Sequence, residues 1–107
     1  MKELLDELQK RLDPTPRRNP HGYMERVPLI VCADGFSMSV QADRITYCSP
    51  RNDEGPWHAA EVWCPSETSP RLMDWAEQDE HPTDTVYPYV PLAVIAQVIE
   101  DHGGFKL

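Results

Sequence analysis

Three cysteines and four histidines are the residues of this chain whose chemistry could be catalytic or metal-binding. Cys32, Cys48 and Cys64 lie sixteen residues apart, and His58 lies six residues before Cys64. Structural zinc sites usually take their ligands in close pairs, because two ligands on one tight turn are positioned at little entropic cost. These spacings do not predict a zinc site, and Cys48 and Cys64 are interpreted as buried structural thiols.

A cysteine nucleophile would need a histidine base beside it. His58 is the one histidine near a cysteine on a predicted strand, and no surrounding motif supports the pair. His102 falls in the last turn of a predicted helix, where a positive charge suits the helix dipole. No glycine-rich phosphate loop, Gly-x-Ser-x-Gly motif or dinucleotide fingerprint occurs. We therefore predict a protein that is not an enzyme and holds no metal or cofactor, with a small metal-dependent or thiol enzyme as the third alternative.

The net charge of −8 over 107 residues argues against direct nucleic-acid binding, which usually needs a basic face. No apolar run approaches the roughly 20 residues that cross a membrane. Charged residues interrupt the first eight positions, where a secretion signal needs an apolar core. Because the cysteines form no CxxC pair, reduced thiols and a cytoplasmic location are expected.

The clearest structural signal is a β-hairpin over 29–40, where two β-prone runs meet at Asp34-Gly35. A two-residue type I′ turn suits Asp-Gly, because both of its central residues need positive φ. That turn would place Ile30 and Cys32 with two serines on one face of the hairpin. The other face, predicted to be buried, would hold Leu29, Val31, Ala33, Phe36, Met38 and Val40.

Helical periodicity marks both ends of the chain. Leucines at i, i+4 and i+8 predict a helix over 2–12, followed by an extended proline-rich linker over 13–22. An isolated helix of this length is marginal in water, so we expect it to dock on the body or to pair with a second copy. A second helix should begin at Pro91 and end before Gly103, covering the apolar face of the hairpin.

Further strands are predicted at 44–48, 57–64 and 85–90, with a short helix from Pro70 to about residue 78. Pro88 within the last strand indicates an edge position or a bulge. On strand 57–64 we expect Ala60, Val62 and Cys64 inside, with both tryptophans partly exposed. The predicted fold is α+β: an antiparallel sheet of four to five strands with the C-terminal helix on one face, forming a domain over 23–107, plus the N-terminal helix and linker over 1–22.

Acidic and aromatic side chains form the candidate partner-binding surface. Segment 67–84 holds six carboxylates against Arg71 alone, which is either a solvated face or a surface that engages a basic partner. Tryptophan, tyrosine and arginine are the usual anchors of protein interfaces. The candidate residues are Arg51, Asp53, Glu54, Trp57, Trp63, Asp74, Trp75, Glu77, Asp79, Glu80 and Tyr87.

Several short strings carry a resemblance to a known group of proteins. They are Cys-Ala-Asp-Gly-Phe-Ser at 32–37, Val-Gln-Ala at 40–42, Tyr-Cys-Ser-Pro-Arg at 47–51, Asp-Thr-Val-Tyr at 84–87, Tyr-Val-Pro at 89–91 and His-Gly-Gly at 102–104. Over 28–104 the chain resembles small, largely uncharacterised proteins of tailed bacteriophages and prophages. The resemblance implies an accessory protein made in the cytoplasm of an infected bacterium, and it implies no catalytic residues.

Two functions are compatible with this context. Small acidic phage proteins often bind host machinery, as anti-CRISPR inhibitors do, which by analogy favours a non-enzymatic protein-binding module. Its most specific form is an inhibitor of a host defence complex of the CRISPR-Cas kind, bound through a basic surface of a host protein or ribonucleoprotein. The alternative is a phage structural or morphogenetic protein that forms homodimers through residues 2–12.

Overall fold

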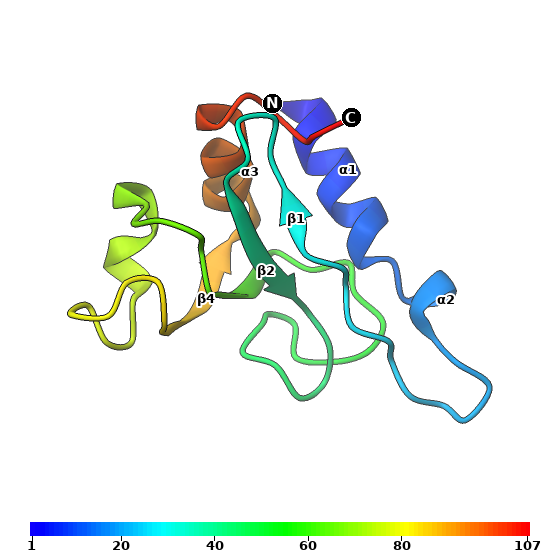
Figure 1. Ribbon diagram of the computed structural model, residues 1–107. Helices are drawn as coiled ribbons and strands as arrows, with labels where there is room; N and C mark the ends of the chain where they lie inside the picture. The colour runs from blue at the N-terminus through cyan, green and yellow to red at the C-terminus, as the bar shows by residue number, and fades with distance from the viewer.

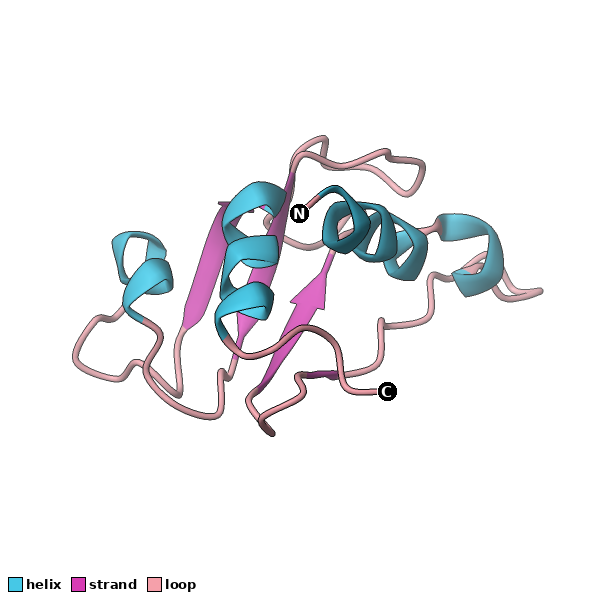
Figure 2. Ribbon diagram, turned by 90° about the horizontal axis from the view of Figure 1, so that it is seen from above, coloured by secondary structure: helices cyan, strands magenta, loops and turns pink.

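The computed structural model describes all 107 residues and contains one four-stranded antiparallel sheet in the order β1-β2-β3-β4. Helix α3 packs against one face of this sheet and α1 lies beside α3, while Figure 1 looks onto the opposite face, which no helix covers (Figures 1 and 2). This architecture confirms the α+β class. The elements are α1 (Lys2–Leu12), α2 (Pro14–Arg17), β1 (Ile30–Val31), β2 (Ser37–Gln41), β3 (Ala59–Trp63), the 3-10 helix η1 (Pro70–Trp75), β4 (Val86–Pro91) and α3 (Leu92–Asp101).

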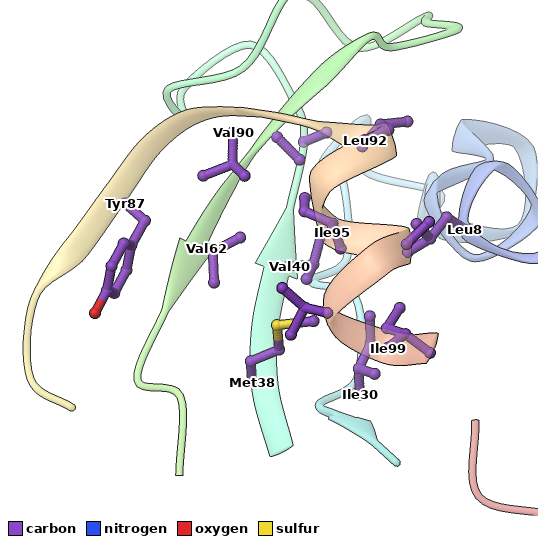
Figure 3. Packing of buried hydrophobic residues seen from close by; sticks show 14 of the residues in the cluster. Leu8, Ile30, Met38, Val40, Val62, Tyr87, Val90, Leu92, Ile95 and Ile99 are labelled. Atoms are coloured by element: carbon purple, nitrogen blue, oxygen red, sulfur yellow. The ribbon is translucent and has the colours of Figure 1, made fainter. Parts of the chain in front are cut away.

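Helix α3 is the element that the sequence predicted best. It begins directly after Pro91, and the chain leaves it through Gly103, whose φ of +88° is readily adopted by glycine. Its apolar side is buried against the sheet, where Val40, Val62 and Val90 line up across three strands (Figure 3). As predicted, this helix covers the hairpin over Phe36, Met38 and Val40, whereas Leu29 and Ala33 are exposed and Val31 is only partly buried. The buried positions of the helix are Leu92, Ile95, Ala96, Val98 and Ile99.

The hairpin forms, but its predicted register is wrong by one residue. Ile30 pairs with Met38, and the Cys32 amide donates to the Phe36 carbonyl at 2.8 Å, so the loop holds three residues instead of two. Such a loop combines a tight turn with a glycine at positive φ, and Gly35 has φ +96°. Because side chains alternate along a strand, the slip buries Ile30 and Cys32 and leaves Leu29 53% exposed. Phe36, Met38 and Val40 are buried as predicted.

Residues 44–48 do not form the predicted strand and belong to a long loop over 42–58. The Asp43 carboxylate accepts hydrogen bonds from the backbone N–H groups of Ile45 and Thr46, both at 2.9 Å. The Thr46 hydroxyl accepts in turn from the Asp43 N–H at 3.0 Å. These local side-chain bonds occupy backbone groups that a sheet would otherwise pair, and they fold the segment into a compact turn.

Helix α1 packs its buried leucines against the rest of the same chain. Leu8 and Leu12 are buried in the same core cluster as α3 and the sheet (Figure 3). The prediction of an extended linker after α1 is wrong, because Pro14–Arg17 form the helical turn α2, in which the Asp13 carboxylate accepts from the Thr15 N–H at 2.9 Å. The N–H at the first position of a helix has no acceptor within the helix, so a proline there loses no hydrogen bond. A proline-rich composition therefore suits a helical turn as well as an extended spacer.

The remaining strands agree with the sequence in their positions and differ in details. In β3, Ala60 and Val62 are buried as predicted, whereas Cys64 lies beyond the strand at φ +50° and is partly exposed. In β4, Pro88 sits on an edge strand, and the pairing with β3 shifts between Ala60 and Val62, which confirms the expected irregularity. The short helix is confined to η1, with Leu72 buried.

Candidate partner-binding surface

The structure separates the predicted partner-binding residues into distinct places and removes two of them from the surface. Trp57 is 2% exposed and Tyr87 is fully buried, so neither can contact a partner, and these two predictions are wrong. Arg51, Asp53 and Glu54 lie in the long loop. Trp63 ends β3, Asp74 and Trp75 end η1, and the remaining three, Glu77, Asp79 and Glu80, lie between η1 and β4.

Trp57 and Tyr87 are buried because other elements cover them. Gln9 of α1 donates its side-chain amide to the Trp57 carbonyl at 2.7 Å, which holds the helix over this part of the loop. The Tyr87 ring lies among core side chains, and its hydroxyl donates to the Pro82 carbonyl. Burial raises the pKa of Tyr87. Both aromatic residues therefore stabilise the fold, and neither forms part of a binding surface.

Among the predicted aromatic anchors, Trp63 is the most exposed, with 43% of its surface accessible. It follows the buried Val62 in β3, so its side chain points away from the face that α3 covers. A shallow hollow of about 200 Å³ adjoins the indole, with Glu77 and Asp84 on its wall. Backbone bonds fix this wall: the Glu77 N–H donates to the Val86 carbonyl at 3.0 Å, and the Gln78 N–H donates to the Thr85 hydroxyl at 2.9 Å.

Four exposed carboxylates lie in the segment 77–84, and two of them, Glu77 and Asp84, line the hollow beside Trp63. We call this group the acidic edge, and it consists of Glu77, Asp79, Glu80 and Asp84. None of the four forms an ion pair with a basic side chain of the same molecule. Their charges are therefore free to act on a partner. Asp74 and the half-buried Trp75 line a different hollow, between η1 and α3, next to the ion pair of Arg71 with Asp101.

A second exposed surface contains residues that the sequence did not single out, apart from Arg51. We call it the tyrosine patch, and it links the long loop to the outer edge of β4. The ring centroids of Tyr47 and Tyr89 are 5.9 Å apart, and the Arg51 guanidinium lies 5.1 Å from the centroid of Tyr47. The Arg51 side chain also donates to the Ile45 carbonyl at 3.2 Å. The patch consists of Tyr23, Ile45, Tyr47, Arg51 and Tyr89.

His102, Cys32 and Cys48 have structural environments in the fold. His102 Nδ1 lies 2.7 Å from an Asp34 carboxylate oxygen, and the Phe36 ring stacks on the imidazole at 4.0 Å. This contact ties the tip of the hairpin to the end of α3. Burial raises the pKa of Cys32 to about 11, which suppresses the thiolate needed for nucleophilic attack. The Cys48 thiol is buried and donates to the Asp43 carbonyl at 3.0 Å, as expected of a structural thiol.

Three further findings bear on function. No three histidine, cysteine, aspartate or glutamate side chains come together in an arrangement that could hold a metal ion. None of the helices has the length and apolar character that crossing a membrane requires. Comparison of the chain with protein-family models, with curated proteins and with solved structures finds no match.

Proposed function

We propose that this protein is a non-enzymatic binding module that attaches to a basic surface of another protein through Trp63 and the acidic edge. The observation that carries the proposal is the hollow in which an exposed indole adjoins Glu77 and Asp84. A lysine or arginine side chain of the partner is attracted by the π face of tryptophan and by carboxylates at the same time. The occupant of this surface is therefore a cationic side chain that projects from a protein.

Electrostatics supports the same kind of partner. The chain carries a net charge of −8, and two of its unpaired carboxylates, Glu77 and Asp84, line the hollow beside the aromatic anchor. Such a surface accelerates encounter with a basic protein and disfavours acidic ones. An exposed tryptophan at the edge of a charged surface is a typical energetic anchor, since a few aromatic residues usually supply most of the binding energy.

The more specific form of the proposal places the protein in an infected bacterium, as an inhibitor of a host defence complex of the CRISPR-Cas kind. The support for this form is the resemblance of segments 32–37, 47–51 and 84–87 to phage proteins. A complex that binds nucleic acid exposes basic surfaces, and an acidic protein can occupy them in place of the nucleic acid. The partner in this form is a host protein or ribonucleoprotein, and direct nucleic-acid binding by this chain is not part of it.

The experiment measures binding of the full chain to purified nucleic-acid-binding defence complexes from a host bacterium, by biolayer interferometry at low and moderate salt. Trp63→Ala should weaken binding by about tenfold or more, as expected for an interface anchor. The double variant Glu77→Gln/Asp84→Asn should also weaken binding, and its loss of affinity should be larger at low salt than at moderate salt, because salt screens exposed charges.

The matched control is Glu3→Gln/Asp6→Asn, which changes the net charge by the same amount on the exposed side of α1. If both double variants weaken binding equally, net charge alone drives association and the hollow is not the site. If no complex binds at low salt, the inhibitor form of the proposal is wrong. Binding to one complex that is insensitive to Trp63→Ala would place the contact elsewhere on the molecule.

Self-association through the N-terminal helix receives no support from the geometry. The leucines that would pair two helices, Leu8 and Leu12, are 0% and 1% exposed within a single chain. Exposing them for a partner would open the core of the protein. A structural role in the phage particle would therefore have to use another surface.

A further inference from the structure

Asp34-Gly35, at the tip of the hairpin, is the one place in the chain where aspartate precedes glycine, and no asparagine does so. In such a pair the backbone nitrogen of glycine can attack the side-chain carboxyl carbon of aspartate, because glycine has no Cβ to hinder the approach. The new C–N bond closes a five-membered succinimide ring, and the amide hydrogen leaves with the carboxyl hydroxyl as water. Water then opens the ring at either carbonyl, which gives back aspartate or yields isoaspartate.

In the folded chain both reacting groups are engaged in other contacts. The Gly35 N–H, whose nitrogen would attack, donates to the Cys32 carbonyl at 2.9 Å. One oxygen of the Asp34 carboxylate accepts from the Phe36 N–H at 2.9 Å, and the other lies 2.7 Å from His102 Nδ1. The carboxyl group therefore cannot turn toward the glycine nitrogen without breaking a hydrogen bond.

The same contacts keep the carboxyl group of Asp34 ionised. Ring closure expels water from the protonated acid, because an oxygen of the carboxylate is a poor leaving group. The pKa of Asp34 is lowered, first by the hydrogen bond from the Phe36 N–H and second by His102. At a given pH the reactive, protonated form is therefore rarer in the folded chain than in the unfolded one.

These contacts exist only in the fold, because they join the hairpin tip to the chain that follows α3 (Figure 1). The Asp34 N–H donates to the His102 carbonyl at 3.2 Å, and the Ala33 N–H donates to the Gly104 carbonyl at 2.9 Å. The imidazole stacks on Phe36, which leaves its side chain 17% exposed. The Asp34 side chain is 51% exposed, so hydrogen bonds rather than burial restrain it.

We propose that Asp34-Gly35 is a site of isoaspartate formation that the contact with His102 holds inactive while the protein is folded. Isoaspartate would add one main-chain atom to the hairpin loop and would leave the free carboxyl group on the Cα of residue 34. The modified loop could not place that group against His102 as before. An opening of the hairpin tip would thus be recorded as a covalent change. The proposal goes beyond the proposed function and involves neither exposed surface.

The test is to age the full chain at one near-neutral pH, folded in buffer or unfolded in guanidinium chloride, and to measure isoaspartate at residue 34. Digestion followed by electron-transfer mass spectrometry distinguishes the two isomers by their backbone fragments. The unfolded chain should react about tenfold faster or more, since an opening that costs about 1.4 kcal/mol already gives this factor. His102→Phe keeps a ring against Phe36 and removes the nitrogen, so it should raise the rate several-fold in buffer and leave it unchanged in guanidinium chloride.

His21→Phe is the matched control, because it makes the same substitution at an exposed histidine in the segment after α2. It should react at the rate of the wild type. Leu8→Ala lowers the global stability and leaves the hairpin tip intact, so it should accelerate the reaction less than His102→Phe does. Equal rates for folded and unfolded wild type, or no isoaspartate at residue 34 in the unfolded chain, would overturn the proposal. So would a His102→Phe rate no higher than that of His21→Phe or Leu8→Ala.

Discussion

At the scale of single residues, Arg17 connects three segments of the chain, and its position in a proline-rich stretch did not predict this role. Its guanidinium donates to the carbonyls of Leu12, Glu25 and Ala42 at 2.8–3.0 Å, and its side chain is 6% exposed. One nitrogen makes no hydrogen bond and lies 4.0 Å from the Asp43 carboxylate. Burial lowers the pKa of Arg17, and Asp43 opposes that shift. One side chain thus joins the end of α1, the segment before β1 and the end of β2.

Removing this side chain should destabilise the protein strongly. We expect Arg17→Ala to lower the free energy of unfolding by about 3 kcal/mol, because it leaves buried carbonyls without donors and Asp43 without its partner. Arg17→Lys should not restore stability, since one ammonium group cannot reproduce the fork of a guanidinium. Urea denaturation measures both. Arg18→Ala, at the exposed neighbour, is the control, and an equal loss for both alanine variants would contradict this role of Arg17.

The contact between Asp34 and His102 predicts how stability depends on pH. The pKa of Asp34 is lowered, first by the hydrogen bond from the Phe36 N–H and second by His102. Since the unfolded chain has an aspartate pKa of about 3.9, the contribution of this carboxylate is complete above that pH. It is lost as the pH falls through the lower pKa of the folded state.

Asp34→Asn should therefore be less stable than the wild type at about pH 5, and the difference should shrink as the pH falls toward 2. Urea denaturation of both proteins over this series gives the difference in free energy of unfolding directly. A difference that stays constant over the whole series would show that the carboxylate charge does not stabilise the fold. His102→Ala should reduce the pH-dependent part, because it removes the second cause of the lowered pKa.

At the scale of elements, helix α1 depends on its contact with α3. Eleven residues do not form a stable helix alone in water, so α1 depends on the burial of Leu8 and Leu12. Its exposed side carries the ion pairs of Lys2 with Asp6 and Arg11 with Glu7, which add little stability. The helix is thus held by its apolar stripe, and the rest of the domain needs it as cover.

Leu8→Ala should lower the free energy of unfolding by about 2–5 kcal/mol, as truncation of a fully buried leucine does. Leu4→Ala is the comparison on the same helix, because Leu4 is only partly buried and its truncation should matter less. Chemical denaturation gives the two values, and hydrogen exchange of the α1 amides reports whether the helix detaches. Equal and small losses would indicate that α1 is dispensable for the core.

At the scale of the whole molecule, the protein presents two exposed surfaces of different chemistry. The helices leave one face of the sheet open, and the segment between η1 and β4, which holds the acidic edge, lies at one side of the molecule (Figure 1). The tyrosine patch lies at the end formed by the long loop and the segment after α2.

The sequence by itself determined the elements whose pattern is local. The 3.6-residue period of α3, its limits at Pro91 and Gly103 and the edge character of β4 follow from propensities that act within a few residues. The α+β class follows from these elements. Phe36, Met38 and Val40 were correctly placed inside, because the alternation along a single strand does not depend on its partner.

Only the tertiary structure decided what each element meets. The register of β1 depended on whether two or three residues close the hairpin, and that choice moved Leu29 to the surface and Cys32 into the core. Trp57 and Arg17 are buried because α1 and the turn after it fold back over the long loop, which no local pattern encodes. Tyr89 is exposed because a bulge reverses its direction. Burial is a property of contacts between distant segments, so a binding surface made of exposed residues could be located only once those contacts were known.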